Sequence, residues 1–137
     1  MSAYILVVDD DEHDLSFTIR ALEKCSISKS QIRIARDGED ALNLLLHHKI
    51  SKPSLILLDL KMPKIDGFEV LKKIRSTPTF SQVPIIIVSG SVLKDDQVRA
   101  ALLGANNYVQ KSIEFKEFAK FLCLAISPYI ASLKMLI

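Results

Sequence analysis

Five short strand-like runs, separated by segments with helical periodicity, constrain the fold of this chain more than any other feature. The runs lie at residues 4–8, 31–35, 55–58, 85–88 and 107–110, lengths typical of strands and too short for helices. After the first run, Leu15, Ile19 and Leu22 recur at the spacing of one helix face. Strands that alternate with helices over short connections predict one parallel sheet covered on both faces. We therefore expect an α/β fold of five strand–helix units, (βα)5, wound in both directions from the centre of the sheet.

Length and charge limit the classes of protein to consider. A chain of 137 residues is one domain's worth, and its net charge of +2 with scattered basic residues gives no basic field for nucleic acid. No apolar run is long enough to span a membrane, and the first residues lack the cationic segment of a secretory signal. We expect a cytoplasmic protein that binds neither nucleic acid nor membrane.

Polar residues of particular chemistry end four of the five strands. Asp9 and Asp10 follow the first strand, Asp59 ends the third, Ser89 the fourth and Lys111 the fifth. Parallel strands place their carboxyl ends at one edge of a sheet, which is where open α/β folds bind ligands. We therefore expect three carboxylates, a hydroxyl and an ammonium to converge there.

Such a cluster favours phosphoryl chemistry on an aspartate. Three adjacent carboxylates repel one another unless a cation compensates them, and Mg²⁺ takes one or two carboxylates together with water and phosphate oxygens. Asp59 then remains as a nucleophile of the aspartyl-phosphate type. Lys111 and the metal would neutralise the transferring group, and Ser89 would donate a hydrogen bond to it.

With these residues in place, the sequence resembles the receiver domains of response regulators in two-component signalling. The resemblance rests on the Asp9-Asp10 pair, on the segment 58–63 (Leu-Asp-Leu-Lys-Met-Pro), on Ser89 and on Lys111. It implies a flavodoxin-like five-stranded sheet with strand order 2-1-3-4-5, which would bring Asp10 beside Asp59. It also implies that residues 1–137 form one receiver domain without an output domain.

The resemblance assigns a role to each site residue. Asp59 would accept a phosphoryl group from a sensor histidine kinase or phosphotransfer protein, so the chain would be a signalling domain and not an enzyme. The implied Mg²⁺ ligands are Asp10, Asp59, the backbone carbonyl of Lys61 and, through water, Asp9. The implied switch and catalytic residues are Ser89, Tyr108 and Lys111. Phosphorylation would alter a surface that contacts a downstream protein.

Two positions depart from the family pattern. The lysine is usually followed by a proline after a cis bond, whereas Ser112 follows Lys111 here. Because a cis bond before a residue other than proline costs about 2.5–4 kcal/mol, we expect a trans Lys111–Ser112 bond and a less firmly held lysine. Gly90 follows Ser89, and we expect it to leave the pocket open to small phosphodonors such as acetyl phosphate.

The last helix, expected over residues 113–127, carries apolar residues beyond those that a core needs. Phe121 and Leu124 lie off its core face, and apolar residues continue at 128–130 and 135–137. This pattern predicts a homodimer or partner surface formed by the fourth helix, the fifth strand and the last helix. The residues expected to pack the two helices are Val98, Ala101 and Leu102 in the fourth, and Phe115, Phe118, Ala119, Leu122, Ala125 and Ile126 in the last.

Cys25 and Cys123 fall in apolar helical stretches, far apart in sequence and without metal-ligand spacing. We expect both to be reduced packing residues.

Three other readings fit parts of the pattern less well. A haloacid-dehalogenase-type phosphatase needs a second acid two residues after the nucleophile, and that position is Lys61. An FMN-binding flavodoxin has no use for three clustered acids, and the first strand lacks a phosphate loop. A degenerate receiver that acts only as a scaffold would not need the complete residue set, although Ser112 leaves room for one.

Overall fold

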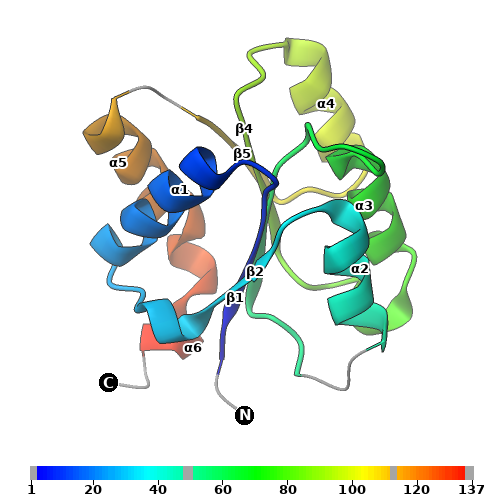
Figure 1. Ribbon diagram of the computed structural model, residues 1–137, viewed down its shortest axis with the longest axis horizontal. Helices are drawn as coiled ribbons and strands as arrows, with labels where there is room; N and C mark the ends of the chain where they lie inside the picture. Colours follow the sequence, from blue (N-terminus) through cyan, green and yellow to red (C-terminus); the bar gives the residue numbers. More distant parts are fainter. Residues whose placement is uncertain (1–2, 48–50, 112–113, 135–137) are drawn as a thin grey trace.

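A parallel five-stranded sheet forms the centre of the computed structural model, which describes residues 3–47, 51–111 and 114–134 (Figure 1). The strands are β1 (Ile5–Val8), β2 (Ile32–Ala35), β3 (Leu55–Leu58), β4 (Ile85–Ser89) and β5 (Asn107–Gln110). Their order across the sheet is β2-β1-β3-β4-β5, with every neighbouring pair parallel. The predicted flavodoxin-like order 2-1-3-4-5 is confirmed.

Helices cover both faces of this sheet (Figure 1). One face carries α1 (Glu12–Lys24) and α5 (Phe115–Ile126), and the other carries α2 (Gly38–His47), α3 (Gly67–Arg75) and α4 (Lys94–Leu102). The remaining helical segments are the 3₁₀ turns η1 (Lys29–Gln31), η2 (Pro78–Phe80) and η3 (Ser127–Tyr129), and the short α6 (Ala131–Lys134). Among the described residues, none of the helices combines the length and the apolar character needed to cross a bilayer.

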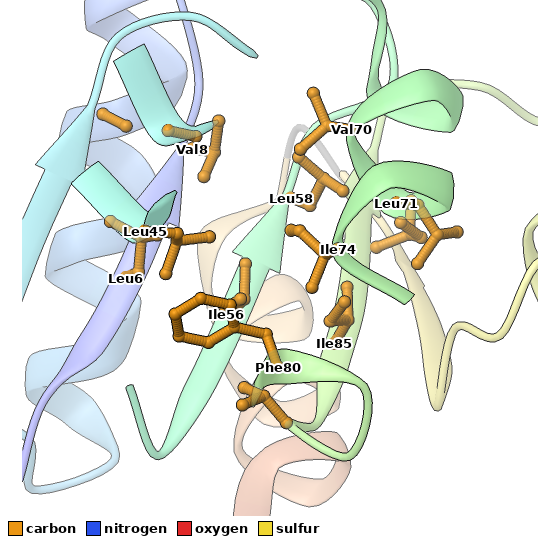
Figure 2. Packing of buried hydrophobic residues seen from close by; sticks show 14 of the residues in the cluster. Leu6, Val8, Leu45, Ile56, Leu58, Val70, Leu71, Ile74, Phe80 and Ile85 are labelled. Carbon is orange, nitrogen blue, oxygen red and sulfur yellow. The ribbon is translucent and has the colours of Figure 1, made fainter. Parts of the chain in front are cut away.

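The two hydrophobic cores lie on opposite faces of the sheet, and alternate residues of each strand enter them. In β1, Ile5 and Val7 pack against α1 and α5, whereas Leu6 and Val8 point to the face of α2 and α3. Figure 2 shows Leu6 and Val8 in this second core, with residues of β3, α2 and α3 around them. Because both faces are covered, β1 and β3 are apolar at every position, and β4 is apolar at every position except Ser89 at its end.

The strand register brings the site residues together. Val8 pairs with Leu58, so Asp9 and Asp59, the next residue of each strand, continue side by side, and the Asp59 amide donates to the Val8 carbonyl at 3.0 Å. On the other side, the Lys111 amide donates to the Ser89 carbonyl at 2.8 Å.

Gly67 allows α3 to begin close against the end of β3. Its amide donates to the Leu60 carbonyl at 2.8 Å, and a Cβ at this position would lie 2.2 Å from the backbone oxygen of Asp59. Only glycine permits this approach. The Asp66 side chain caps the helix by accepting from the Glu69 amide at 3.0 Å. Gly104 lies just after the end of α4 with φ +106°, a positive value that glycine commonly adopts after a helix.

The prediction that the two cysteines are reduced packing residues was wrong. Cys25, at the end of α1, and Cys123, in α5, form a disulfide with a Cα–Cα distance of 5.4 Å. Sequence spacing gave no sign of this pair, because 98 residues separate the two positions. They meet because α1 and α5 lie side by side on one face of the sheet (Figure 1).

Several packing predictions also need correction. Val98, Ala101 and Leu102 are exposed, and Ala100 is the buried residue of α4. Ile130, expected to extend the exposed apolar surface, is buried in the core beneath α1 and α5.

In α5 the predicted core face is buried except for Phe115, which is half-buried, and Phe121 and Leu124 are exposed as predicted. The Lys111–Ser112 bond and residues 135–137 lie outside the described residues.

Candidate functional site

Three aspartates form a compact acidic cluster at the carboxyl edge of the sheet. Asp9 and Asp10 follow β1, Asp59 follows β3, and one carboxylate oxygen from each lies within 4.8 Å of the others. Asp9 and Asp59 are buried, whereas Asp10 is exposed. Converging carboxylate oxygens are the ligands that hard divalent cations prefer. The donor set therefore fits a divalent metal ion.

Lys111 lies at the centre of a group of carboxylates. Its ammonium donates to Asp14 Oδ2 at 2.8 Å and to Asp9 Oδ2 at 3.0 Å, and it lies 3.5 Å from Asp59 Oδ1. Only 14% of the lysine side chain is exposed, against 46% for Asp14, 4% for Asp9 and 7% for Asp59. The structure thus brings Lys111, from the end of β5, to the acids at the ends of β1 and β3.

The charges of this cluster alter the affinity of its members for protons. The pKa of Asp59 is raised to about 6, chiefly by burial; the charge of Lys111 opposes this rise, and the charge of Asp9 adds to it. Burial also raises the pKa of Asp9, against the lowering effects of the Asp11 amide and Lys111. For Lys111 burial alone would lower the pKa, but the bond to Asp14 and the charges of Asp59 and Asp9 outweigh burial, so its pKa is raised. The cluster therefore favours the binding of additional positive charge.

A cavity of about 420 Å³ opens onto these side chains. It is lined by Asp10, Asp11, Asp14, Asp59, Lys61, Ser89, Gly90, Ser91 and Lys111. A Cβ at Gly90 would meet no atom within 4 Å, so this side of the cavity is open as predicted. The backbone of Lys61 lowers the pKa of the Asp59 carboxyl, against the effect of burial.

Ser89 and Tyr108 are linked through the loop after β4. The fully buried Ser89 hydroxyl accepts a bond from the Ser91 amide at 3.2 Å, and the Tyr108 hydroxyl donates to the Ser91 carbonyl at 3.1 Å. Ser91 in turn donates from its own hydroxyl to Asp96 Oδ2 at 2.6 Å, at the start of α4. One short loop therefore joins the cavity to α4 and β5.

Tyr108 does not line this cavity but a second groove, and Lys111 lines both. This groove, of about 920 Å³, runs along β5 and α5 and includes Gln97, Phe121 and Leu124. The structure thus brings five of the predicted side chains to one cavity region (Asp9, Asp10, Asp59, Ser89 and Lys111) and connects the sixth, Tyr108, through the loop.

Three residues of this region were not predicted from the sequence: Asp14, Ser91 and Asp96. Asp14 lies in the first turn of α1, where acids also occur simply because they favour the helix dipole. Its distance of five residues from Asp9 gave no direct signal of a shared partner. Asp96 lies in the first turn of α4, where the same preference for acids applies.

Comparison with known proteins agrees with this geometry. A sequence model of the family described as "Response regulator receiver domain" matches residues 5–122. The chain belongs to the response regulator receiver family. This receiver is 34% identical over 120 residues to the response regulator Rcp1 of Synechocystis sp., covering 85% of this chain and 81% of Rcp1. It is 33% identical over 119 residues to the probable methanogenesis regulatory protein FilR2 of Methanothrix harundinacea, covering 85% and 76%.

Solved receiver structures share the fold over nearly the whole chain. The Mn²⁺-bound form of Rcp1 superposes with a TM-score of 0.82 at 31% identity, covering 94% of this chain and 95% of that one. The phosphorylated cyanobacterial phytochrome response regulator RcpA gives a TM-score of 0.82 at 29% identity, with 96% of both chains covered. The present chain is thus a signalling receiver whose acidic cluster fits the divalent-metal binding of its family.

Proposed function

We propose that this chain is a single-domain response regulator that is phosphorylated on Asp59 in a Mg²⁺-dependent reaction. The observation that carries the proposal is the position of the Asp59 carboxylate, which lies within 4.8 Å of two further acids that can hold a metal and 3.5 Å from the Lys111 ammonium. A nucleophile placed between cationic groups is the arrangement that phosphoryl transfer needs, since the reaction depends mainly on positioning and on neutralising the phosphoryl oxygens.

In this reaction an oxygen of Asp59 attacks the phosphorus atom of a phosphohistidine in a sensor kinase or phosphotransfer protein. The new bond joins that oxygen to phosphorus, the phosphorus–nitrogen bond breaks, and the histidine leaves as the imidazole. Lys111 neutralises charge on the transferred group. The opening at Gly90 leaves space for small donors such as acetyl phosphate.

The metal-binding residues in this proposal are Asp10, Asp59 and the backbone carbonyl of Lys61, with Asp9 acting through water. When bound, Mg²⁺ supplies positive charge that favours the ionised form of Asp59 and offsets the phosphoryl oxygens. Asp10, the most accessible of the three acids, lies where an ion entering from solvent is met first.

The signal would then pass through Ser89 and Tyr108. A phosphoryl group adds about −1.5 to −2 charges and three acceptor oxygens, which can attract the Ser89 hydroxyl. Because the same loop carries Ser91, a movement of Ser89 alters the carbonyl that Tyr108 binds. This would bias an existing equilibrium between two arrangements of α4 and β5.

The surface that responds carries exposed apolar side chains on and beside α4 and α5. They are Val92, Leu93, Val98, Leu102, Phe121 and Leu124. Together with the groove along β5, they suit a homodimer or a downstream protein in the cytoplasm. Sedimentation should show a concentration-dependent dimer that changes with phosphorylation, and a monomer under all conditions would contradict the dimer.

The direct test is incubation of the protein with acetyl phosphate and Mg²⁺, followed by intact mass measurement and size exclusion. Wild type should gain one phosphoryl group, Asp59→Asn none, and the protein in excess EDTA none. Asp95→Asn, a matched change at an exposed aspartate of α4, should behave as wild type. Unchanged mass in wild type after incubation with both a small donor and a phosphorylated kinase would refute the proposed function.

A further inference from the structure

The closest carboxylate to the Lys111 ammonium is not the proposed phosphoryl acceptor. Asp14 Oδ2 lies 2.8 Å from Lys111 Nζ, whereas Asp59 Oδ1 lies 3.5 Å away, beyond a good charge-assisted hydrogen bond. The proposed phosphoryl transfer gives Lys111 a task at Asp59, yet its shortest bond runs to a different helix. Asp14 has no role in the reaction as described so far.

The fold places Asp14 at the mouth of the cavity. It belongs to the first turn of α1, which Asp11 caps by accepting from the Asp14 amide at 3.0 Å. Its side chain is 46% exposed, against 7% for Asp59 and 4% for Asp9. A solvated carboxylate can release a partner at small cost because water replaces the lost contact. The bond to Asp14 is therefore the easiest of the three lysine contacts to exchange.

Asp14 also lines the cavity that would receive the phosphoryl group. An anionic side chain there repels an anionic ligand and at the same time engages the lysine that would neutralise it. Both effects act in one direction. They weaken the binding of a phosphoryl group until Lys111 moves from Asp14 toward Asp59.

We propose that Asp14 is a positioning residue that holds Lys111 at the rim of the resting cavity and competes with the phosphoryl group for it. The proposal rests on the proposed function of Asp59. Through Asp14, the first turn of α1 would influence how readily Asp59 is phosphorylated.

The test measures the binding of beryllofluoride, a mimic of the phosphoryl group, by ¹⁹F NMR in saturating Mg²⁺. Asp14→Asn should bind it about two- to fivefold more tightly than wild type, the range expected for removal of one exposed ion pair. The gain should shrink at high salt, which screens exposed charges, and Asp14→Glu should restore wild-type affinity. In the metal-free protein, the Lys111 ammonium protons should exchange with water faster in Asp14→Asn.

Glu12→Gln is the matched control, because it removes the same charge from the same helix turn. Glu12 pairs with Arg36 and does not line the cavity, so beryllofluoride affinity should stay at the wild-type value. Calorimetric Mg²⁺ affinity and the melting temperature of Asp14→Asn show whether the fold and the metal site are intact.

The outcomes separate this inference from the proposed function. Tighter binding by Asp14→Asn and not by Glu12→Gln supports competition for the lysine. Equal or weaker binding by a folded Asp14→Asn protein, while wild type still binds, overturns the role of Asp14 and leaves the function of Asp59 in place. A wild-type protein that binds no beryllofluoride refutes the proposed function and this inference with it.

Discussion

Replacing Asp59 by asparagine should stabilise the metal-free protein. The folded-state pKa of Asp59 is raised from 3.8 to about 6 by burial. A shift of about two units corresponds to about 3 kcal/mol of unfavourable free energy in the ionised folded state, at about 1.4 kcal/mol per unit. Asn is nearly isosteric and carries no charge, so most of this penalty disappears. We expect Asp59→Asn to raise the free energy of unfolding by about 1–3 kcal/mol at pH 7.5, the lower values reflecting partial solvation.

The raised pKa of Asp59 also determines how the free energy of unfolding depends on pH. Because the folded protein holds the Asp59 proton more tightly than the unfolded chain, the wild-type free energy of unfolding should fall as the pH rises from about 4 to about 6. The difference between wild type and Asp59→Asn should be absent below pH 4 and complete above pH 6. Lys111 does not alter this window, because its pKa is raised from 10.5 and its contribution is constant below that value.

The assay is urea unfolding in EDTA, followed by circular dichroism from pH 3.5 to 8. The control is Asp95→Asn, the same substitution at an exposed position, which should change stability by no more than about 0.5 kcal/mol. Added Mg²⁺ should stabilise wild type more than Asp59→Asn. An Asp59→Asn protein that is no more stable than wild type at pH 7.5 in EDTA would refute the electrostatic reasoning.

Three further changes test the scaffold by denaturant or thermal unfolding. Gly67→Ala should lower the free energy of unfolding by about 3 kcal/mol or more, since its Cβ would meet the Asp59 carbonyl. Gly90→Ala should leave the free energy of unfolding nearly unchanged. Equal losses in the two variants would contradict this reasoning. Under oxidising conditions, Cys25→Ser should lower the free energy of unfolding by about 2–5 kcal/mol relative to wild type. A reductant should abolish this difference, because it also breaks the wild-type disulfide. Arg75→Lys should lower the free energy of unfolding by about 2–4 kcal/mol. The reason is that the guanidinium donates to the carbonyls of Val83, at 2.7 Å, and Gly104, at 2.9 Å. A loss below about 0.5 kcal/mol would contradict that role.

The backbone arrangement was predictable because it depends on local patterns. Runs such as 55–58, apolar at every position, indicate strands covered on both faces, and alternation with helices requires a parallel sheet. That sheet brings Asp9, Asp59 and Lys111 to one edge whatever the details of packing. The convergence of the site was therefore predictable before any distance was known, although the strand order itself came from the resemblance to receivers.

Partners across helices were not predictable, because they depend on which residues of two separate elements face each other. Cys25 and Cys123 form a disulfide only because α1 and α5 lie side by side. The apolar residues of α4 suggested a buried face, yet that helix buries only Ala100. Its periodicity could not show that the neighbouring elements leave Val98 and Leu102 uncovered.

The sequence by itself determined which side chains at strand ends reach the carboxyl edge of the sheet, since the carboxyl ends of parallel strands all lie at that edge. Only the tertiary structure decided which of those side chains form ion pairs and how deeply each is buried. Lys111 is bonded to Asp14 as well as to Asp9, and Asp59 is buried deeply enough for its pKa to rise. Ion pairing and burial depend on distances of a few ångströms between elements far apart in the chain, and these distances are set by packing.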